Sequence, residues 1–144
     1  MIRDVRVEAI HLGADEGGPL HAVDSANAVA GQGLEGDRHF DAGGVGPARA
    51  LTLVEADVVA DVGLPPGGTR RQLTVSGAGL NDLVGRRFRV GEVECLGVEL
   101  CEPCLHLQSL TRPGIIDDLV HRGGINADIV AGGTIRVGDE IAEL

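Results

Sequence analysis

The stretch Arg87-Phe88-Arg89-Val90-Gly91-Glu92-Val93-Glu94-Cys95-Leu96 indicates the fold more directly than any other part of the chain. Apolar residues alternate with charged ones before Gly91-Glu92 and resume directly after it, which is typical of strands with one buried face. A two-residue connection that contains glycine commonly joins antiparallel neighbours. The stretch therefore predicts a hairpin of two strands, at 87–90 and 93–96.

Short apolar or alternating runs, separated by glycine and proline, continue on both sides of this hairpin. They predict strands at about 4–12, 21–29, 50–54 and 72–75. Short helices are expected at 55–62, 103–110 and 114–120. The sequence at 136–141 resembles 89–93 and predicts that the same strand–turn arrangement occurs twice. Many short strands and few helices favour a mainly β fold, a closed or nearly closed barrel with a few short peripheral helices.

Length and cysteine content suggest one cytoplasmic domain. A chain of 144 residues is expected to form a single domain over 1–144 with a core that needs no disulfides. No apolar run is long enough to span a bilayer, and the first residues do not resemble a signal peptide. Three cysteines, two of them three positions apart, favour reduced thiol chemistry. We therefore expect a cytoplasmic protein without a membrane partner.

The charge pattern narrows the choice of ligands. A net charge of −10 argues against nucleic acid as a partner, because phosphate neutralisation needs a basic surface. All 12 basic residues are arginines, and the absence of lysine excludes a pyridoxal phosphate Schiff base within this chain. Between Gly68 and Gly91 lie five arginines and one acidic residue. This segment predicts a local cationic wall that would bind a small anion.

The segment Cys101-Glu102-Pro103-Cys104-Leu105-His106 holds two of the three cysteines. Pro103 suits the first turn of a helix, which would place Cys104 where the positive end of the helix dipole favours a thiolate. The Cys-x-x-Cys spacing also fits a dithiol redox pair or half of a zinc site. Zinc would need two further ligands, for which the candidates are His39, His106 and His121.

The segment Gly33-Leu34-Glu35-Gly36-Asp37-Arg38-His39 places an acid, a guanidinium and an imidazole side by side after two glycines. Glycines allow backbone N–H groups to approach an anion, and the three side chains offer acceptor, donor and proton-transfer groups. The structural alternative is a salt bridge between Asp37 and Arg38 with a packed His39.

Several motifs follow one another in a characteristic order. They are Gly-Asp-Arg-His at 36–39, the strand at 49–55, Arg-Arg-Gln-Leu-Thr-Val at 70–75, the segment 80–91, Pro-Cys-Leu at 103–105, Arg-Gly-Gly at 122–124 and the segment 133–139. This series resembles the MOSC domain, the C-terminal domain of molybdenum cofactor sulfurases, which also occurs as small stand-alone bacterial proteins. The resemblance is clearest over 22–144 and implies a MOSC-type β-barrel.

The resemblance also implies a cofactor and a set of site residues. The cofactor is the molybdenum cofactor, a molybdopterin dithiolene that carries a phosphate. The cysteine matching Cys104 is the key residue in the family, either as molybdenum thiolate ligand or as persulfide sulfur carrier. The activity would be sulfur transfer or reduction of N-hydroxylated compounds. Asp37 and His39 join Cys104 as implied catalytic residues, and the implied cofactor-binding residues are Arg38, Arg70, Arg71, Gln72, Arg122, Gly123 and Gly124.

The implied partners are a small-molecule substrate and a separate electron donor or sulfur donor protein. Gln72 stands where the family usually has asparagine. One alternative function is a non-redox binding module for a small anionic or sulfur-containing ligand. Such a module would bind its ligand without turnover. Another alternative is a structural zinc protein, which would lose its fold in the presence of a chelator.

Overall fold

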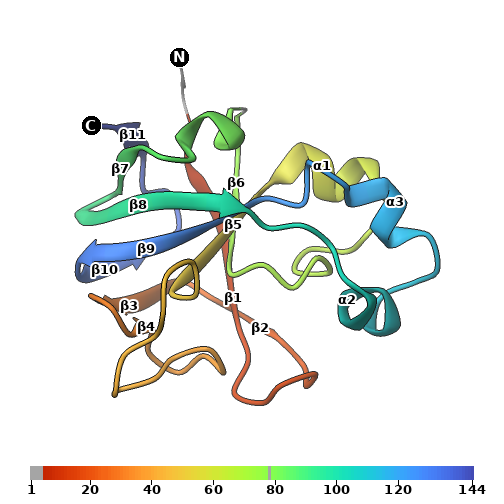
Figure 1. Ribbon diagram of the computed structural model, residues 1–144, viewed down its shortest axis with the longest axis horizontal. Helices are drawn as coiled ribbons and strands as arrows, with labels where there is room; N and C mark the ends of the chain where they lie inside the picture. The colour runs from red at the N-terminus through yellow and green to blue at the C-terminus, as the bar shows by residue number, and fades with distance from the viewer. Residues whose placement is uncertain (1–4, 78) are drawn as a thin grey trace.

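The computed structural model describes residues 5–77 and 79–144, and over these residues the chain is mainly β with a few short helices (Figure 1). The larger sheet contains β1 (Val7–Leu12), β2 (His21–Val23), β5 (Leu51–Glu55), β6 (Leu73–Val75), β7 (Arg87–Val90), β8 (Val93–Leu100), β9 (Ile125–Ala131) and β11 (Ile141–Glu143). Its strand order is β11-β7-β8-β9-β5-β6-β1-β2. The smaller sheet contains β3 (Ser25–Val29), β4 (Gly33–Leu34) and β10 (Gly133–Arg136), in the order β10-β3-β4. The helices are α1 (Ala56–Asp61), the 3-10 helix η1 (Leu80–Leu83), α2 (Leu105–Leu110) and α3 (Ile115–Leu119).

The hairpin predicted from the sequence is confirmed. Val90 lies opposite Val93, so the two residues Gly91-Glu92 connect β7 to β8. The strands expected at 50–54 and 72–75 correspond to β5 and β6, which pair in parallel, and the helix expected at 55–62 corresponds to α1. The strand expected at 4–12 corresponds to β1, although Asp4 lies outside the described residues.

The expected closed barrel is wrong for the described residues, because both sheets are open. The edge strands of the larger sheet, β2 and β11, do not pair with each other. One isolated bridge joins Arg6 to Glu140, next to backbone hydrogen bonds from Ile141 N to Val5 O and from Val7 N to Asp139 O, both 2.8 Å. We call this contact between 5–7 and 138–141 the seam. It is too short to form a strand ladder, so it approaches closure without completing a barrel.

Three further elements differ from the expectation. The strand expected at 21–29 is divided at Asp24, so that β2 joins the larger sheet and β3 the smaller one. The strand–turn arrangement expected at 136–141 is present, since a turn at 137–138 follows β10, but it forms no hairpin, because β10 pairs with β3 while β11 pairs with β7. The helix expected from Pro103 begins at Leu105, because Cys104 has an extended backbone and caps α2.

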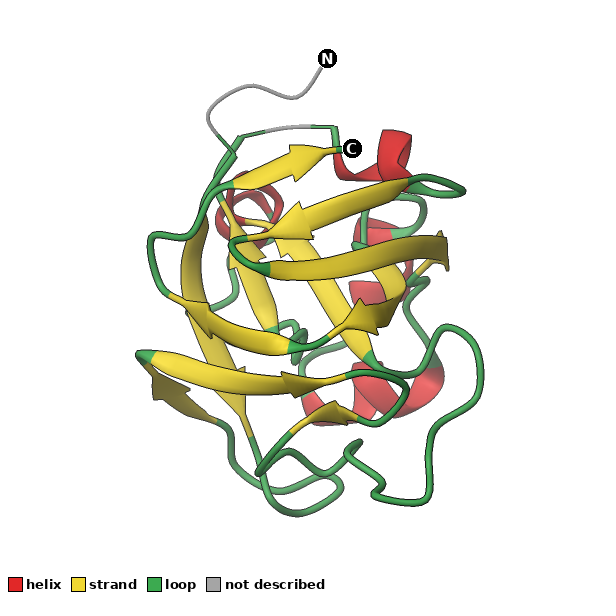
Figure 2. Ribbon diagram, turned by 90° about the vertical axis from the view of Figure 1, so that its left-hand side faces the viewer, coloured by secondary structure: helices red, strands yellow, loops and turns green. Residues whose placement is uncertain are grey.

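Strands of both sheets surround one apolar core, around which they curve in Figure 2. Phe88 of β7, Leu53 of β5 and Ile135 of β10 are all fully buried in it. Each such side chain contributes about 1.5–3 kcal/mol on burial, so the shared core holds the two open sheets together. Within the described part of the chain, no helix is long and apolar enough to cross a membrane.

A second, smaller apolar cluster joins the three α-helices beside the larger sheet (Figure 1). It consists of Val62 after α1, Leu107 of α2, and Ile115 and Leu119 of α3. Because these side chains pack on one another and not in the main core, the helices form a separate wall. The space between this wall and the sheet contains the candidate site.

Candidate functional site

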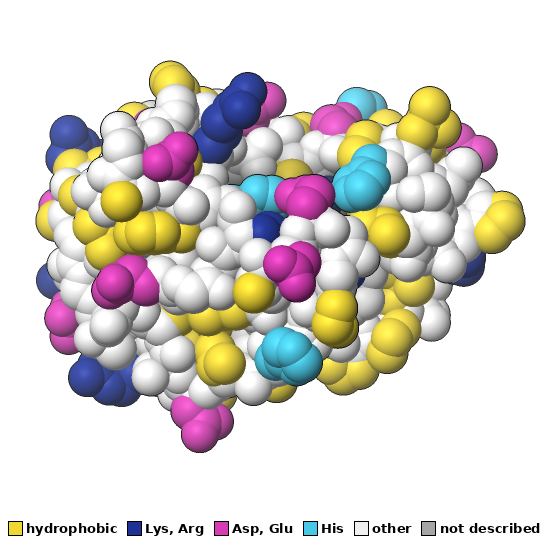
Figure 3. Space-filling view, turned by 90° about the horizontal axis from the view of Figure 1, so that it is seen from below, with side chains coloured by type: hydrophobic (Ala, Val, Ile, Leu, Met, Phe, Trp, Pro, Cys, Tyr) yellow, Lys and Arg dark blue, Asp and Glu magenta, His cyan; other side chains and the backbone are white. Residues whose placement is uncertain are grey.

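A cleft of about 530 Å³ lies between the helical wall and the larger sheet. Its volume falls within the roughly 300–1,000 Å³ typical of small-molecule and cofactor sites. The lining comes from Glu16, the loop at 38–41, the segment 45–52, the segment 70–72 that precedes β6, the segment 101–110 and Asn126 of β9. Figure 3 shows histidine and acidic side chains gathered near the middle of the face seen from below, with arginine visible between them.

The cleft brings together some of the predicted site residues and leaves out others. Those that line it are Arg38, His39, Arg70, Arg71, Gln72 and Cys104. Those that do not are Asp37, Arg122, Gly123 and Gly124. Arg49 also lines the cleft, although it was predicted only as part of the motif at 49–55 and not as a site residue.

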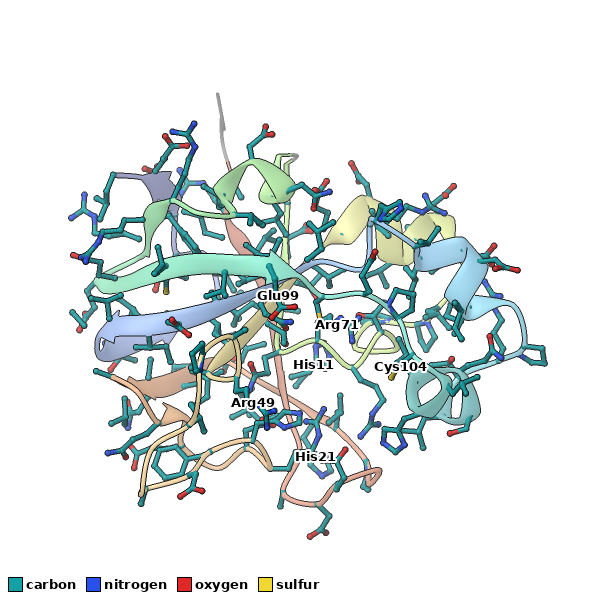
Figure 4. All side chains as sticks on the ribbon, in the orientation of Figure 1. His11, His21, Arg49, Arg71, Glu99 and Cys104 are labelled. Atoms are coloured by element: carbon teal, nitrogen blue, oxygen red, sulfur yellow. The ribbon has the colours of Figure 1, made fainter. Side chains whose placement is uncertain are left out.

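Cys104 is the exposed thiol of the cleft. It is the N-cap of α2, with φ −136° and ψ 172°, and its Sγ accepts a hydrogen bond from Leu107 N at 3.5 Å. Figure 4 shows Cys104 at the start of α2, on the side that faces Arg71 and the sheet. The sulfur therefore lies exposed at the start of α2, where a ligand in the cleft can reach it.

Burial disfavours the thiolate form of the other two cysteines. Burial, chiefly, raises the pKa of Cys101, although Arg71 acts in the opposite direction. Burial together with Glu94 raises the pKa of Cys95 to about 12, and Cys95 lies in the core. Since the thiolate is the reactive form, Cys104 is the thiol that the cleft presents to a ligand.

Asp37 does not reach the cleft, because its side chain is completely buried. Its Oδ1 accepts hydrogen bonds from Arg38 Nη1 at 3.0 Å and Gly13 N at 3.1 Å. Its Oδ2 accepts from Gln72 Nε2 at 2.8 Å and His39 N at 3.2 Å. Asp37 does not line the cleft but positions the two residues that follow it, and its implied catalytic role stays a prediction.

Gln72, like Asp37, forms its hydrogen bonds with neighbouring residues of the protein. Its Oε1 accepts a hydrogen bond from Thr52 N at 2.9 Å, and its backbone N donates to Thr52 Oγ1 at 2.9 Å. Because the Nε2 end is bonded to Asp37, both ends of the amide are engaged. Gln72 therefore links β5, β6 and the loop of Asp37, and its implied contact with a cofactor stays a prediction.

Arg71 lies at the back of the cleft and connects two backbone segments. It is 9% exposed, and it donates from Nε to Gly123 O at 2.8 Å and from Nη2 to Cys101 O at 2.9 Å. A Cβ at Gly123 would lie 2.6 Å from Cys101 O, so only glycine allows this approach. Arg71 thus fixes the segment that leads to Cys104, and two of its three nitrogens are already committed.

The other two members of the Arg-Gly-Gly motif lie away from the cleft. Arg122 donates from Nη1 to Asp61 Oδ2 and from Nε to Asp118 O, both at 2.6 Å. Gly124 has φ +101°, and a Cβ there would lie only 2.0 Å from Leu53 O. The motif therefore holds α1, α3 and β5 in place and does not line the cleft, and its implied role in cofactor binding stays a prediction.

The cationic wall expected between Gly68 and Gly91 is not continuous. Arg86 and Arg87 form exposed ion pairs with Glu143 and Glu94, outside the cleft. The cations that do line the cleft come from three separate segments, at 38, 49 and 70–71. Sequence position alone could not show this grouping, because folding brings the three segments together.

Three arginines leave donors available for an anion. The Arg38 side chain is 6% exposed, and its buried Nε has no hydrogen-bond partner in the described part of the chain. Arg70 donates from Nη2 to Gly18 O at 2.8 Å, and its pKa is lowered by desolvation and then by Arg38. Arg49 is exposed, and its side chain makes no ion pair or hydrogen bond to the residues described. An anion in the cleft would relieve this local excess of positive charge.

His39 lines the cleft, and its surroundings favour the neutral imidazole. Its pKa is lowered from 6.5, chiefly by desolvation and then by Arg38, and Asp37 and Glu16 only partly offset this. A histidine with a lowered pKa is more fully neutral at pH 7 than a free one. Its imidazole can therefore accept a hydrogen bond or a proton from a ligand.

The lowered pKa of His39 predicts a pH dependence of stability. The unfolded chain binds more protons than the folded chain between the folded pKa and 6.5, so the free energy of unfolding should fall as pH falls through this window. His39→Gln should remove part of this fall, measured by urea unfolding followed by far-UV circular dichroism between pH 7 and pH 5. His21→Gln, on the exposed strand β2, is the matched control. Equal pH profiles for the His39 variant and the wild type would contradict the prediction.

Comparison with solved structures supports the fold. The YuaD protein from Bacillus subtilis is 18% identical with a TM-score of 0.77, over 98% of this chain and 97% of that chain. YiiM from Escherichia coli is 21% identical with a TM-score of 0.70, over 100% of this chain and 70% of that chain. YiiM from Geobacillus stearothermophilus is 14% identical with a TM-score of 0.70, over 97% and 75%. No curated protein sequence matches the chain significantly. The family model of the MOSC domain matches residues 43–142.

Proposed function

Since the chain belongs to the MOSC domain family, we propose that its cleft binds the molybdenum cofactor and that Cys104 is the working thiol. The observation that carries this proposal is that a single cleft holds one exposed thiol and three arginines, Arg38, Arg49 and Arg70, that still have N–H donors without a partner among the described residues. A thiolate is a suitable ligand for a soft metal, and guanidinium groups suit a phosphate.

The donor set fits this cofactor better than a bare metal ion. Across residues 5–77 and 79–144, no group of three or more histidine, cysteine or acidic side chains could hold a metal. His106 and His121, candidate zinc ligands from the sequence, instead contact Glu16 and Glu102. A single thiolate fits a metal that arrives with other ligands of its own. When bound, the cofactor would supply a redox-active metal already held by dithiolene sulfurs.

The cofactor's phosphate would lie against Arg38, Arg49 and Arg70. The unpaired Nε of Arg38 is a buried donor that an anion could satisfy, which would remove a cost of about 1–3 kcal/mol. Arg71 would contribute mainly through its support of the segment at 101–104. Neutral His39 would accept a proton from the bound substrate or from water in the cleft.

A sulfur carrier is the second candidate role for Cys104. Its exposure favours this role, because a sulfur donor protein must reach the thiol to leave a persulfide on it. Cys101 is less suited to the same transfer, since burial raises its pKa. The two roles predict different outcomes for the same variant, as set out in the Discussion.

Cofactor binding is tested by reconstitution. Purified protein is incubated with molybdenum cofactor released from a donor enzyme, separated by gel filtration and analysed for molybdenum. We expect near-stoichiometric metal in the wild type and at least about tenfold weaker binding in Arg49→Gln, because a charge-assisted contact to phosphate is lost. Arg136→Gln, which removes the same charge outside the cleft, is the control. Absence of molybdenum from the wild type after reconstitution would overturn the proposal.

A further inference from the structure

A second, smaller pocket of about 200 Å³ adjoins the cleft. It shares Arg70 and Leu110 with the cleft, so a ligand in one would be next to a ligand in the other. Its volume is less than half that of the cleft. That is too small for a pterin cofactor and suits a small molecule.

His11 lines this pocket, and its imidazole is not engaged by any other described residue. It comes from β1, is only 6% exposed, and packs against Gly67, where a Cβ would lie 2.6 Å from the imidazole. Its Nδ1 is sealed from solvent, and neither ring nitrogen has a hydrogen-bond partner among the described residues. An imidazole with both nitrogens uncommitted is unusual at this degree of burial.

The burial of Nδ1 favours one tautomer of His11. Burial lowers the pKa of His11, so the ring is neutral at pH 7 and carries one N–H group. A sealed, unpaired N–H is less tolerable than a sealed lone pair, so the proton belongs on Nε2. Nε2–H is then a hydrogen-bond donor at the accessible edge of the ring.

Arg70 supplies the second donor and shows local strain. It has φ 63°, in the left-handed region that a residue with a side chain rarely adopts, at a cost of roughly 1–3 kcal/mol. Such strain tends to occur at functional sites. Apart from the bond to Gly18 O, its guanidinium N–H groups make no hydrogen bond to the described residues. The strained backbone thus holds a partly free cation between the two cavities.

We propose that this pocket is the substrate subsite and that it binds the carboxylate of a small molecule. Arg70 and His11 would each donate to the carboxylate, and the apolar remainder of the molecule would contact Leu20, Pro66 and Leu110. The pocket lining contains two side chains that can donate, His11 and Arg70, and no acidic side chain, so it favours an anion. The assignment as substrate subsite rests on the proposed function, whereas the binding of a carboxylate does not.

The test uses butyrate as the probe and the metal-free protein. The backbone N–H groups of Gly67 and Gly68, which line the pocket, report binding in a proton–nitrogen NMR titration. We expect saturable shifts with butyrate and none with butylammonium, which has the same apolar body and the opposite charge. The imidazole nitrogens of His11 should shift in the same titration. This readout needs no variant and therefore does not depend on a substituted protein folding.

Two substitutions sharpen the test. His11→Phe should weaken butyrate binding at least about tenfold, because a hydrogen bond to a charged group is lost. His21→Phe, on the exposed strand β2, should leave the affinity unchanged. The proposal is overturned if butyrate shifts Gly67 and Gly68 no more than butylammonium does, or if folded His11→Phe binds butyrate as well as the wild type. Molybdenum loading is measured separately, and His11→Phe should retain it. A failure of the cofactor proposal, seen as absence of molybdenum, can therefore be distinguished from a failure of the carboxylate proposal, seen as absence of butyrate binding.

Discussion

Cys104→Ser is expected to lower the affinity for molybdenum by at least about 100-fold if Cys104 ligates the metal, since even outer-shell substitutions cost roughly 10–100-fold. Serine keeps the size of the side chain and can still cap α2, so the fold should survive. The measurement is the molybdenum-to-protein ratio after reconstitution and gel filtration. Alkylation of the wild type with iodoacetamide should reproduce the loss, because Cys104 is the exposed thiol in the described part of the chain.

The matched control is Cys101→Ser, three residues earlier and largely buried. It should keep most of the molybdenum, because Cys101 contributes its carbonyl to Arg71 and its backbone N–H to Gly124 O, and both survive the substitution. If Cys104 is instead a sulfur carrier, Cys104→Ser should retain molybdenum and lose the sulfur that cyanide releases from a persulfide. A Cys104→Ser protein with full molybdenum and full activity would refute both roles.

Gly124→Ala is expected to destabilise the fold by more than about 4 kcal/mol, a loss reached only by a few kinds of substitution. A Cβ at this position would lie 2.0 Å from Leu53 O, so β5 and the start of β9 would have to separate. The positive φ adds about 1–2 kcal/mol for any residue with a side chain. The expected fall in the melting temperature is about 10 °C or more, followed by far-UV circular dichroism.

Gly138→Ala separates the two causes. Gly138 has φ +96°, but a Cβ there would meet no atom within 4 Å, so this variant should show the backbone strain alone. The difference in stability between the two variants then measures the cost of the steric overlap with β5. If Gly124→Ala is no less stable than Gly138→Ala, the close approach of Gly124 to Leu53 does not constrain the fold.

The local elements of the fold could be predicted from the sequence because they depend on local signals. Alternation on both sides of Gly91-Glu92 was sufficient for the β7–β8 hairpin, and the apolar run at 50–54 was sufficient for β5. The sheets were harder to predict. The division at Asp24 sends β2 and β3 to different sheets, and no local pattern specifies that choice.

The candidate site could be predicted in part for the same reason. The motifs identified Cys104, Arg38 and Arg70, all of which line one cleft. They did not show that Gln72 would donate a hydrogen bond to Asp37, since partners 35 positions apart in the sequence are brought together only by folding. Arg49 was missed as a site residue because nothing in its neighbourhood distinguishes it from a surface arginine.

The seam has a consequence for engineering the chain. Since Ile141 N donates to Val5 O, the two ends of the described chain are neighbours. Proteins with adjacent ends commonly tolerate circular permutation. A permutant could join the ends through a short linker and open at Gly91-Glu92, which does not line the cleft. A fused electron donor could then be attached at a chosen point, and its orientation toward Cys104 would become a design variable.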